Sequence, residues 1–151
     1  MCREYKFFIR MIYMFGSGSF KNGEKAVKIG FTENKDERES AYFLHNPLGQ
    51  FLGWREGDKK LELKLHLRLK DFKETFLDEW FYYEPPVLDI FNETEEQINE
   101  WLWKNKDDIF YSPTLPTFGS LKWEIFMELR EIFDNKNKPV LGIKTLSMDE
   151  I

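Results

Sequence analysis

The sequence predicts an α+β fold in which an N-terminal β-hairpin is followed by helices and by a helical C-terminal extension. Three observations lead to this class. Residues 5–31 are rich in aromatic and β-branched residues and are interrupted by a glycine-rich turn, which is typical of a hairpin. Later segments repeat apolar residues with the period of a helix. The chain of 151 residues suits one domain with a smaller appendage.

Composition excludes several classes of protein. The only cysteine is Cys2, so a disulfide framework is excluded, and one cysteine with two histidines cannot form a usual zinc site. No apolar run approaches the roughly 20 residues that a membrane-spanning helix requires. Because no cleavable signal peptide is recognisable either, we expect a cytoplasmic, intracellular protein.

The net charge of −5 is unevenly distributed along the chain. Residues 1–73 hold 15 Lys and Arg against 10 Asp and Glu, whereas residues 74–151 hold 7 against 17. The front half therefore carries +5 and suits a polyanion such as nucleic acid, whereas the back half carries −10 and repels one. An unevenly charged solvated surface is the simpler interpretation of the same numbers.

The hairpin is expected to comprise strands over 5–15 and 26–31. Between them, Gly16-Ser17-Gly18 resembles a loop that cradles phosphate, but it precedes a strand rather than a helix. It therefore lacks the helix N-terminus that binds phosphate in a nucleotide loop, and we interpret it as the hairpin tip.

Local signals then predict a helix and a third strand. Asn34 is a suitable N-cap for a helix over 35–44, which Asn46, Pro47 and Gly49 would end. Residues 50–55 form a short candidate strand.

Residues 60–72 are ambiguous, because five leucines alternate with charged residues as they would in a strand. Composition favours a helix, since the segment lacks β-branched residues and Leu61, Leu65 and Leu69 form a helical stripe. We therefore predict a helix, which places Glu62 and His66 on neighbouring turns of one face.

The C-terminal part is expected to be helical. A short element at 79–83 is followed by Pro85 and Pro86, where we place the boundary between domains 5–83 and 84–151. The capping box Thr94-Glu95-Glu96-Gln97 opens a predicted helix over 95–108. A loop over 111–119 and a second helix, capped by Ser120 and ending near Asp134, follow. Residues 140–143 could add a short strand.

Five short motifs occur in a recognisable order. They are Met11-Ile12-Tyr13, Val27-Lys28-Ile29-Gly30, Arg38, Leu61-Glu62 with His66, and Glu79-Trp80-Phe81. Taken together, they resemble the GIY-YIG nuclease superfamily, and in particular its phage-type branch, over about residues 9–83. The resemblance implies a small three-stranded antiparallel sheet flanked by helices and a metal-dependent endonuclease that cleaves DNA phosphodiester bonds.

The resemblance also implies a role for each matching residue. Glu62 would hold Mg²⁺ or Mn²⁺, Arg38 would bind the scissile phosphate, and Tyr13 would act as general base or orient the attacking water. Lys28 stands where many members of the family have a tyrosine, so it would stabilise charge rather than accept a proton. His66 would orient Glu62 or carry a proton. Glu79 we interpret as a structural residue of the aromatic segment.

Two further functions compete with nuclease activity. The first two motifs differ from the Gly-Ile-Tyr and Tyr-Ile-Gly of the family, so the first alternative is a protein of this fold without catalysis. It would bind nucleic acid through Lys28, Arg38, Lys64 and Arg68. A phage accessory protein would instead use its acidic C-terminal half to meet a protein partner, with Trp101, Trp103 and Trp123 as anchors. None of these functions requires a membrane or a small-molecule cofactor.

Overall fold

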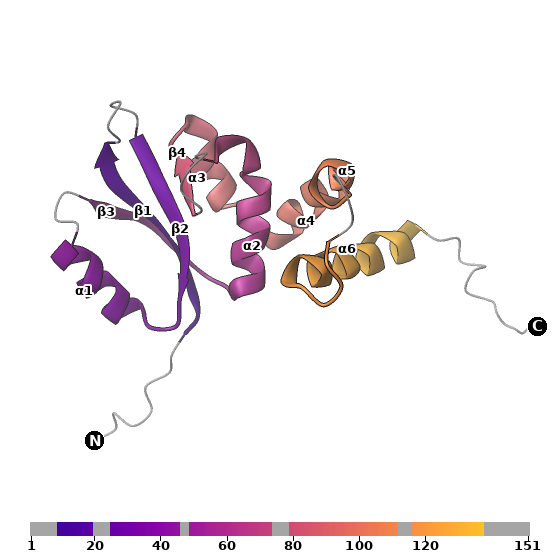
Figure 1. Cartoon of the computed structure of the whole chain (residues 1–151), viewed down its shortest axis with the longest axis horizontal. Coiled ribbons are helices and arrows are strands. Elements are labelled where there is room, and N and C mark those ends of the chain that lie inside the picture. Colours follow the sequence, from indigo (N-terminus) through magenta and orange to yellow (C-terminus); the bar gives the residue numbers. More distant parts are fainter. Residues whose placement is uncertain (1–8, 20–24, 46–48, 74–78, 112–115, 138–151) are drawn as a thin grey trace, which may run out of the picture. The chain divides into compact units, whose positions relative to one another are not determined.

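A computed structural model describes residues 9–19, 25–45, 49–73, 79–111 and 116–137 (Figure 1). The protein is α+β, with one four-stranded antiparallel sheet in the order β3-β1-β2-β4. The strands are β1 (Met11–Ser19), β2 (Lys25–Thr32), β3 (Gln50–Glu56) and β4 (Trp80–Tyr82). The helices are α1 (Lys35–His45), α2 (Lys59–Arg68), α3 (Pro85–Phe91), α4 (Glu95–Lys104), α5 (Lys106–Ile109) and α6 (Leu121–Asn137). The chain divides into two compact units, Met1–Ile98 and Asn99–Ile151, so residues 84–98 belong with the sheet.

The expectation of three strands is corrected to four, because the short element at 79–83 pairs with β2. Strand β4 lies beside Ala26, Val27 and Lys28, and its Phe81 is completely buried. A three-residue strand at the edge gives too short a pattern to identify from alternation, so it was predicted only as an element of unspecified type.

Strand β1 begins and ends later than predicted. Residues 9 and 10 precede it, and it continues from Met11 through the glycine-rich segment that was expected to form the hairpin tip. Gly16 pairs with Val27 on one side and Gln50 on the other, so two neighbouring strands hold the segment extended. The side chain of Ser17 and the expected strand at 140–143 lie outside the described residues.

The register of the central strands assigns their side chains to two faces. Residues directly opposite each other in an antiparallel pair share a face, so Tyr13 lies with Gly30 and Trp54. The hydroxyl of Tyr13 contacts that of Tyr42, so α1 covers this face. Helices α2 and α3 cover the other face, where a Cβ added to Gly53 would lie 3.0 Å from the Phe91 ring. Figure 1 shows α1 and α2 on opposite sides of the sheet.

The helix predicted over 60–72 is confirmed as α2, which is followed by a short 3-10 turn (Lys70–Phe72). Asp58 caps α2, since its carboxylate accepts a hydrogen bond of 2.9 Å from the Leu61 amide. The stripe of leucines 61, 65 and 69 is buried, which decides between the helix and the strand. As a helix, the segment buries this apolar stripe, and the burial stabilises the folded state more than an exposed strand of alternating leucines and charged residues would.

Two helical boundaries differ from the predictions. Pro85 and Pro86 begin α3 instead of marking a break, because proline lacks only an amide that a first helical turn leaves unbonded anyway. The predicted helix over 95–108 is interrupted at Asn105, whose side-chain amide donates to the Trp101 carbonyl at 2.8 Å. The capping box is confirmed by reciprocal hydrogen bonds between Thr94 and Gln97 of 2.9 and 3.1 Å.

The second unit is held together by aromatic side chains of its helices. Helix α6 begins as predicted, with the Ser120 hydroxyl accepting from the Trp123 amide at 3.1 Å. Trp103 stacks on Phe133, with ring centroids 5.9 Å apart and planes 11° apart. Trp103 thus has an internal packing role that lessens its suitability as an anchor for a partner protein. No described helix has the length and apolar character needed to cross a membrane.

Candidate nucleic-acid-cleaving site

Tyr13 lies at the centre of the sheet face that α1 covers. Its side chain is almost completely buried, and it crosses the neighbouring strand above Gly30. A Cβ added to Gly30 would lie only 2.4 Å from the Tyr13 hydroxyl oxygen. Glycine at this position of the second motif therefore makes room for the phenol of the first motif.

Arg38 reaches Tyr13 from the first turns of α1. The start of this helix is fixed by Asn34, whose side-chain oxygen accepts from the Glu37 amide at 3.1 Å, as the sequence predicts. The Arg38 guanidinium donates to the Tyr13 hydroxyl at 3.3 Å. One helical turn further along, the Tyr42 hydroxyl lies 2.9 Å from the same oxygen. Two polar groups, from Arg38 and Tyr42, thus meet at the hydroxyl of Tyr13.

Lys28 lies two residues before Gly30 and on the same side of β2. Its ammonium lies 5.5 Å from the centroid of the Tyr42 ring and 3.6 Å from a carboxylate oxygen of Glu79. Lys28 therefore stands between the tyrosine pair and an acidic group. A cation at this position can stabilise negative charge, which is the role that the family resemblance implies for Lys28.

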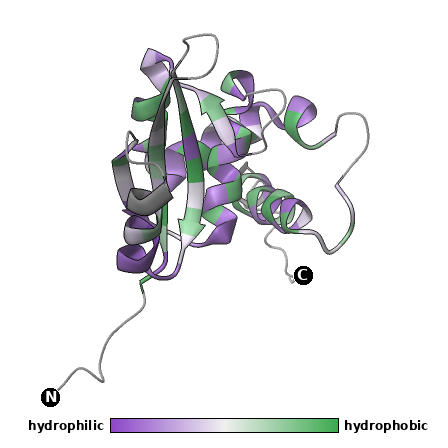
Figure 2. Ribbon diagram, turned by 60° about the vertical axis from the view of Figure 1, so that its left-hand side comes forward, coloured by the Kyte–Doolittle hydropathy of each residue, from purple (hydrophilic) through white to green (hydrophobic). Residues whose placement is uncertain are grey.

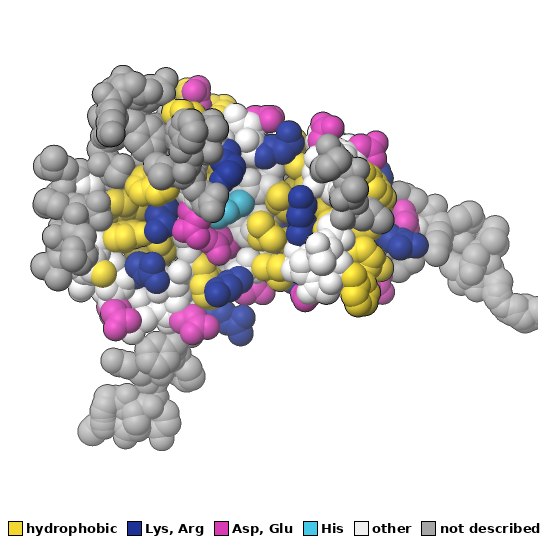
Figure 3. All heavy atoms as spheres, viewed as in Figure 1, with side chains coloured by type: hydrophobic (Ala, Val, Ile, Leu, Met, Phe, Trp, Pro, Cys, Tyr) yellow, Lys and Arg dark blue, Asp and Glu magenta, His cyan; other side chains and the backbone are white. Residues whose placement is uncertain are grey.

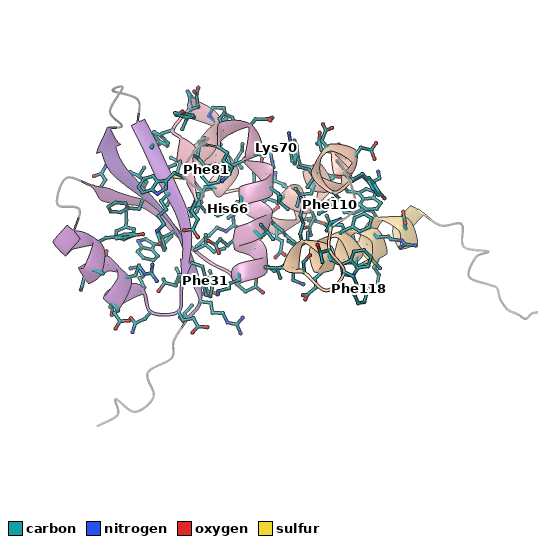
Figure 4. All side chains as sticks on the ribbon, viewed as in Figure 1. Phe31, His66, Lys70, Phe81, Phe110 and Phe118 are labelled. Carbon is teal, nitrogen blue, oxygen red and sulfur yellow. The ribbon has the colours of Figure 1, made fainter. Side chains whose placement is uncertain are left out.

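Glu62 and His66 occupy neighbouring turns of α2 at the edge of β2. Strand β4 pairs with β2 only as far as Lys28, and beyond that point the Ile29 amide donates to the Glu79 carbonyl at 3.0 Å. The Ile29 carbonyl accepts from His66 Nε2 at 2.8 Å, so this nitrogen carries a proton. Figure 4 shows His66 between α2 and β2. The hydrogen bond fixes α2 against the end of the paired part of the sheet.

His66 therefore positions α2 relative to β2. Its Nε2 lies 3.7 Å from a carboxylate oxygen of Glu62, beyond hydrogen-bond distance. Since Nε2 is already bonded to a backbone carbonyl, the geometry favours an orienting role over proton transport by this nitrogen.

The carboxylate of Glu62 is unusually reluctant to ionise. Burial, and to a lesser extent the nearby charge of Glu79, raise its pKa from 4.5 to about 7. Lys59 and Lys28 act in the opposite direction. A partly desolvated carboxylate next to another carboxylate is a site where a bound cation relieves unfavourable charge.

Glu62 fits the chemistry of Mg²⁺ or Mn²⁺, which prefer oxygen ligands. Among the described residues, no three His, Cys, Asp or Glu side chains are grouped so as to hold a metal ion. Mg²⁺ is commonly held by one or two carboxylates together with substrate phosphates and water, so Glu62 is a sufficient protein ligand for that mode.

The environment of Tyr13 raises the pKa of its phenol. Burial is the largest cause, and the hydrogen bond with Tyr42 adds to it, whereas the charge of Arg38 acts in the opposite direction. In the free protein this environment favours the neutral phenol. Of the two roles that the resemblance implies for Tyr13, it favours orienting the attacking water over acting as general base.

An open groove adjoins these residues at the N-terminal end of α1. It has a volume of about 560 Å³ and is lined by Phe31, Thr32, Glu33, Asn34, Glu37, Arg38 and Lys59. Its two cations, Arg38 and Lys59, come from helices on opposite sides of the sheet. Figure 3 shows acidic and basic side chains gathered around the histidine on this side of the molecule.

Lys64 and Arg68 lie elsewhere, which corrects their assignment to nucleic-acid binding. Lys64 is completely buried, and its ammonium lies 2.8 Å from Glu95. Arg68 forms two hydrogen bonds with the carboxylate of Glu93, at 3.1 and 3.0 Å. Both cations face α3 and the start of α4, and they serve to attach these helices to α2.

Two residues of the site were missed or misjudged from the sequence. Tyr42 was not among the predicted site residues, although its spacing of four residues from Arg38 places both on one face of the helix. Glu79 was interpreted as structural, but its side chain is about half exposed at 46% and pairs with Lys28. Its position in the Glu79-Trp80-Phe81 motif was the available signal.

No family model, curated protein sequence or solved structure was found to match this chain. The candidate site therefore rests on the residues themselves and on their geometry.

Proposed function

We propose that this protein is a metal-dependent endonuclease of the GIY-YIG type that cleaves DNA phosphodiester bonds. The observation that carries the proposal is the convergence of separate sequence motifs. Arg38 contacts Tyr13 directly, Lys28 lies against Tyr42, which contacts Tyr13, and the charges of Lys28 and Glu79 act on Glu62. These residues come from β1, β2, α1, α2 and the segment before β4, and Lys28 and Glu79 connect the group around Tyr13 with Glu62 on the other side of the sheet.

Cleavage of a phosphodiester requires an aligned nucleophile, stabilisation of negative charge on phosphorus oxygens and help for the leaving oxygen. Arg38 offers a planar guanidinium that can donate two hydrogen bonds to phosphate oxygens. Lys28 offers a compact positive charge nearby. In the free protein these cations are held by Tyr13 and by Glu79, respectively, so the site is organised before a phosphate enters.

Glu62 would hold the divalent cation. When bound, this cation would act as a Lewis acid that stabilises charge on the phosphate and assists the leaving oxygen. His66 keeps α2 in register with β2, and Glu62 is thereby held at the open edge of that strand. Tyr13, as a neutral phenol bonded to Tyr42 and Arg38, would orient the attacking water.

Plasmid nicking tests the proposal directly. Supercoiled DNA is incubated with the protein in Mg²⁺, in Mn²⁺ and in EDTA, and the wild type is compared with Glu62→Gln. We expect nicking that requires the metal and falls at least about 100-fold in the variant, because the amide cannot replace the charge of a metal ligand. Glu96→Gln, a substitution of the same type at an exposed position of α4, serves as the control and should retain activity.

Two outcomes would contradict the proposal. Equal nicking by Glu62→Gln and the wild type would identify a contaminating nuclease or another site. Salt-sensitive DNA binding without cleavage in either metal would favour a non-catalytic binding protein. The replacement of the first residues of the two family motifs by Met11 and Lys28 is the sequence feature that supports this alternative.

A further inference from the structure

The sheet face under α1 carries a row of three aromatic rings, formed by Tyr42, Phe51 and Trp54. The rings of Tyr42 and Phe51 are 5.5 Å apart with planes 26° apart, and those of Phe51 and Trp54 are 4.7 Å apart with planes 30° apart. Each of the three lies 5.6 or 5.7 Å from the ring of Tyr13. This aromatic row is therefore built directly on the candidate catalytic tyrosine.

The aromatic row is only partly covered. All three rings are partly exposed, whereas Tyr13 beneath them is buried. Helix α1 is mostly hydrophilic (Figure 2), and its Lys35, Arg38 and Tyr42 side chains lie against the aromatic cluster. Figure 3 shows hydrophobic surface with basic side chains beside it on this part of the molecule.

The opposite face of the sheet has a different composition. There the described strand residues are mainly aliphatic, for example Ile12, Met14 and Ile29, and all three are completely buried. Aliphatic side chains suffice to pack a helix on a sheet. The concentration of partly exposed aromatic rings on the α1 face is therefore not required for packing alone.

Basic side chains border the aromatic row. The ammonium of Lys28 lies 5.5 Å from the centroid of Tyr42, and that of Lys35 lies 5.1 Å from the centroid of Trp54. Arg38 lies 5.8 Å from the centroid of the Tyr13 ring beneath the row. Rings for bases combined with cations for phosphates are what a single nucleic-acid strand requires.

We propose that the aromatic row of Tyr42, Phe51 and Trp54 binds unpaired bases of a DNA strand next to the scissile phosphate. The inference rests on the proposed function and specifies its substrate as DNA with an unpaired segment, such as a single strand or a branched junction. Bases of a regular duplex are stacked on each other and do not present free faces to these rings. Bases that stack on Tyr42 and Trp54 would displace the ammonium groups of Lys28 and Lys35 from these rings. The two lysines would then contact the phosphates of the strand.

Binding measured without divalent metal tests this inference separately from catalysis. Fluorescence anisotropy in EDTA compares a labelled oligodeoxythymidine with a duplex of the same length. For Trp54→Leu, which keeps an apolar side chain but removes the ring, we expect affinity for the single strand to fall about 5- to 100-fold. Affinity for the duplex should change less than about twofold, because phosphate contacts dominate it.

Matched variants separate base stacking from damage to the fold. Trp54→Phe retains a ring and should keep most of the single-strand affinity. Trp123→Leu makes the same substitution at another partly exposed tryptophan, in α6, and should leave binding unchanged. Thermal unfolding of each variant identifies any loss that comes from unfolding.

The outcomes distinguish the two proposals. Equal single-strand affinity for Trp54→Leu and the wild type, or no single-strand binding at all, would overturn the inference, even if metal-dependent cleavage of duplex plasmid upheld the proposed function. Trp54-dependent binding of the single strand without any cleavage would uphold the aromatic row as a binding surface and overturn the nuclease.

Discussion

Gly30 offers the sharpest test of how the sheet builds the site. The substitution Gly30→Ala would place a Cβ 2.4 Å from the hydroxyl oxygen of Tyr13 and 2.5 Å from the adjoining ring carbon. Ordinary van der Waals contacts begin near 3.4 Å, so the phenol must recede by about 1 Å. It has little room to do so, because Tyr42, Phe51 and Trp54 surround its ring.

The cost of this clash follows from its surroundings. Forcing extra volume into a packed core destabilises a protein by about 1–3 kcal/mol. Replacing glycine in a strand is expected to contribute about 0.5–1 kcal/mol in the opposite direction, so the net loss lies between about 0 and 2.5 kcal/mol, with a central value of about 1 kcal/mol. Urea unfolding followed by circular dichroism measures this difference. Nicking activity should also fall, since the displaced phenol can no longer meet Arg38.

A double-mutant cycle identifies the cause. Tyr13→Leu removes the ring atoms that the new Cβ would strike, so Gly30→Ala should cost nothing or become favourable in that background. Gly16→Ala, in which the nearest side-chain atom is Leu52 Cδ1 at 3.3 Å, is the control in the same hairpin and should change stability less. Additive effects of Gly30→Ala and Tyr13→Leu would refute the reasoning.

Three other predictions concern charge. With EDTA present, the free energy of unfolding should decrease as the pH rises from about 4.5 to about 7, because the folded state keeps a proton on Glu62 that the unfolded state releases. Glu62→Gln should reduce this slope, and denaturation at several pH values checks it. Arg38→Gln should lower the salt dependence of DNA binding by about one phosphate contact, whereas Arg68→Gln should leave it unchanged in binding titrations at several salt concentrations. Lys64→Met should leave the free energy of unfolding within about 1 kcal/mol of the wild type or raise it, because it removes a buried charge together with its desolvation cost, while its partner Glu95, 49% exposed, is left in contact with water. A loss above about 3 kcal/mol in urea unfolding would contradict this.

Local signals in the sequence predicted most of the elements. The caps at Asn34, Thr94 and Ser120 are confirmed because each depends on hydrogen bonds over three residues. The choice of helix for α2 was correct because propensity and the leucine stripe agreed. Two of the errors occurred at β4 and α3, where three- and seven-residue elements are stabilised by contacts with distant parts of the chain.

The site residues show the same division. The order of motifs singled out Tyr13, Lys28, Arg38 and Glu62. The structure joins Arg38 to Tyr13 by a hydrogen bond and places Lys28 near enough for its charge to act on Glu62. It separates Lys64 and Arg68 from them, although these residues lie on the same helix as Glu62. The angular position of each residue around the axis of α2 determines whether its side chain faces β2 or α3. The sequence alone does not show which side of α2 faces which neighbour.

The sequence by itself determined the hairpin, the capped helices and the residue types capable of phosphate chemistry, because periodicity and capping act over a few neighbouring residues. Only the tertiary structure decided that α1 and α2 lie on opposite faces of the sheet and that His66, one turn after Glu62, bonds to β2 just beyond its pairing with β4. It also decided that Tyr42, Phe51 and Trp54 form one row. These arrangements depend on packing between segments distant in the chain, which short-range patterns do not encode.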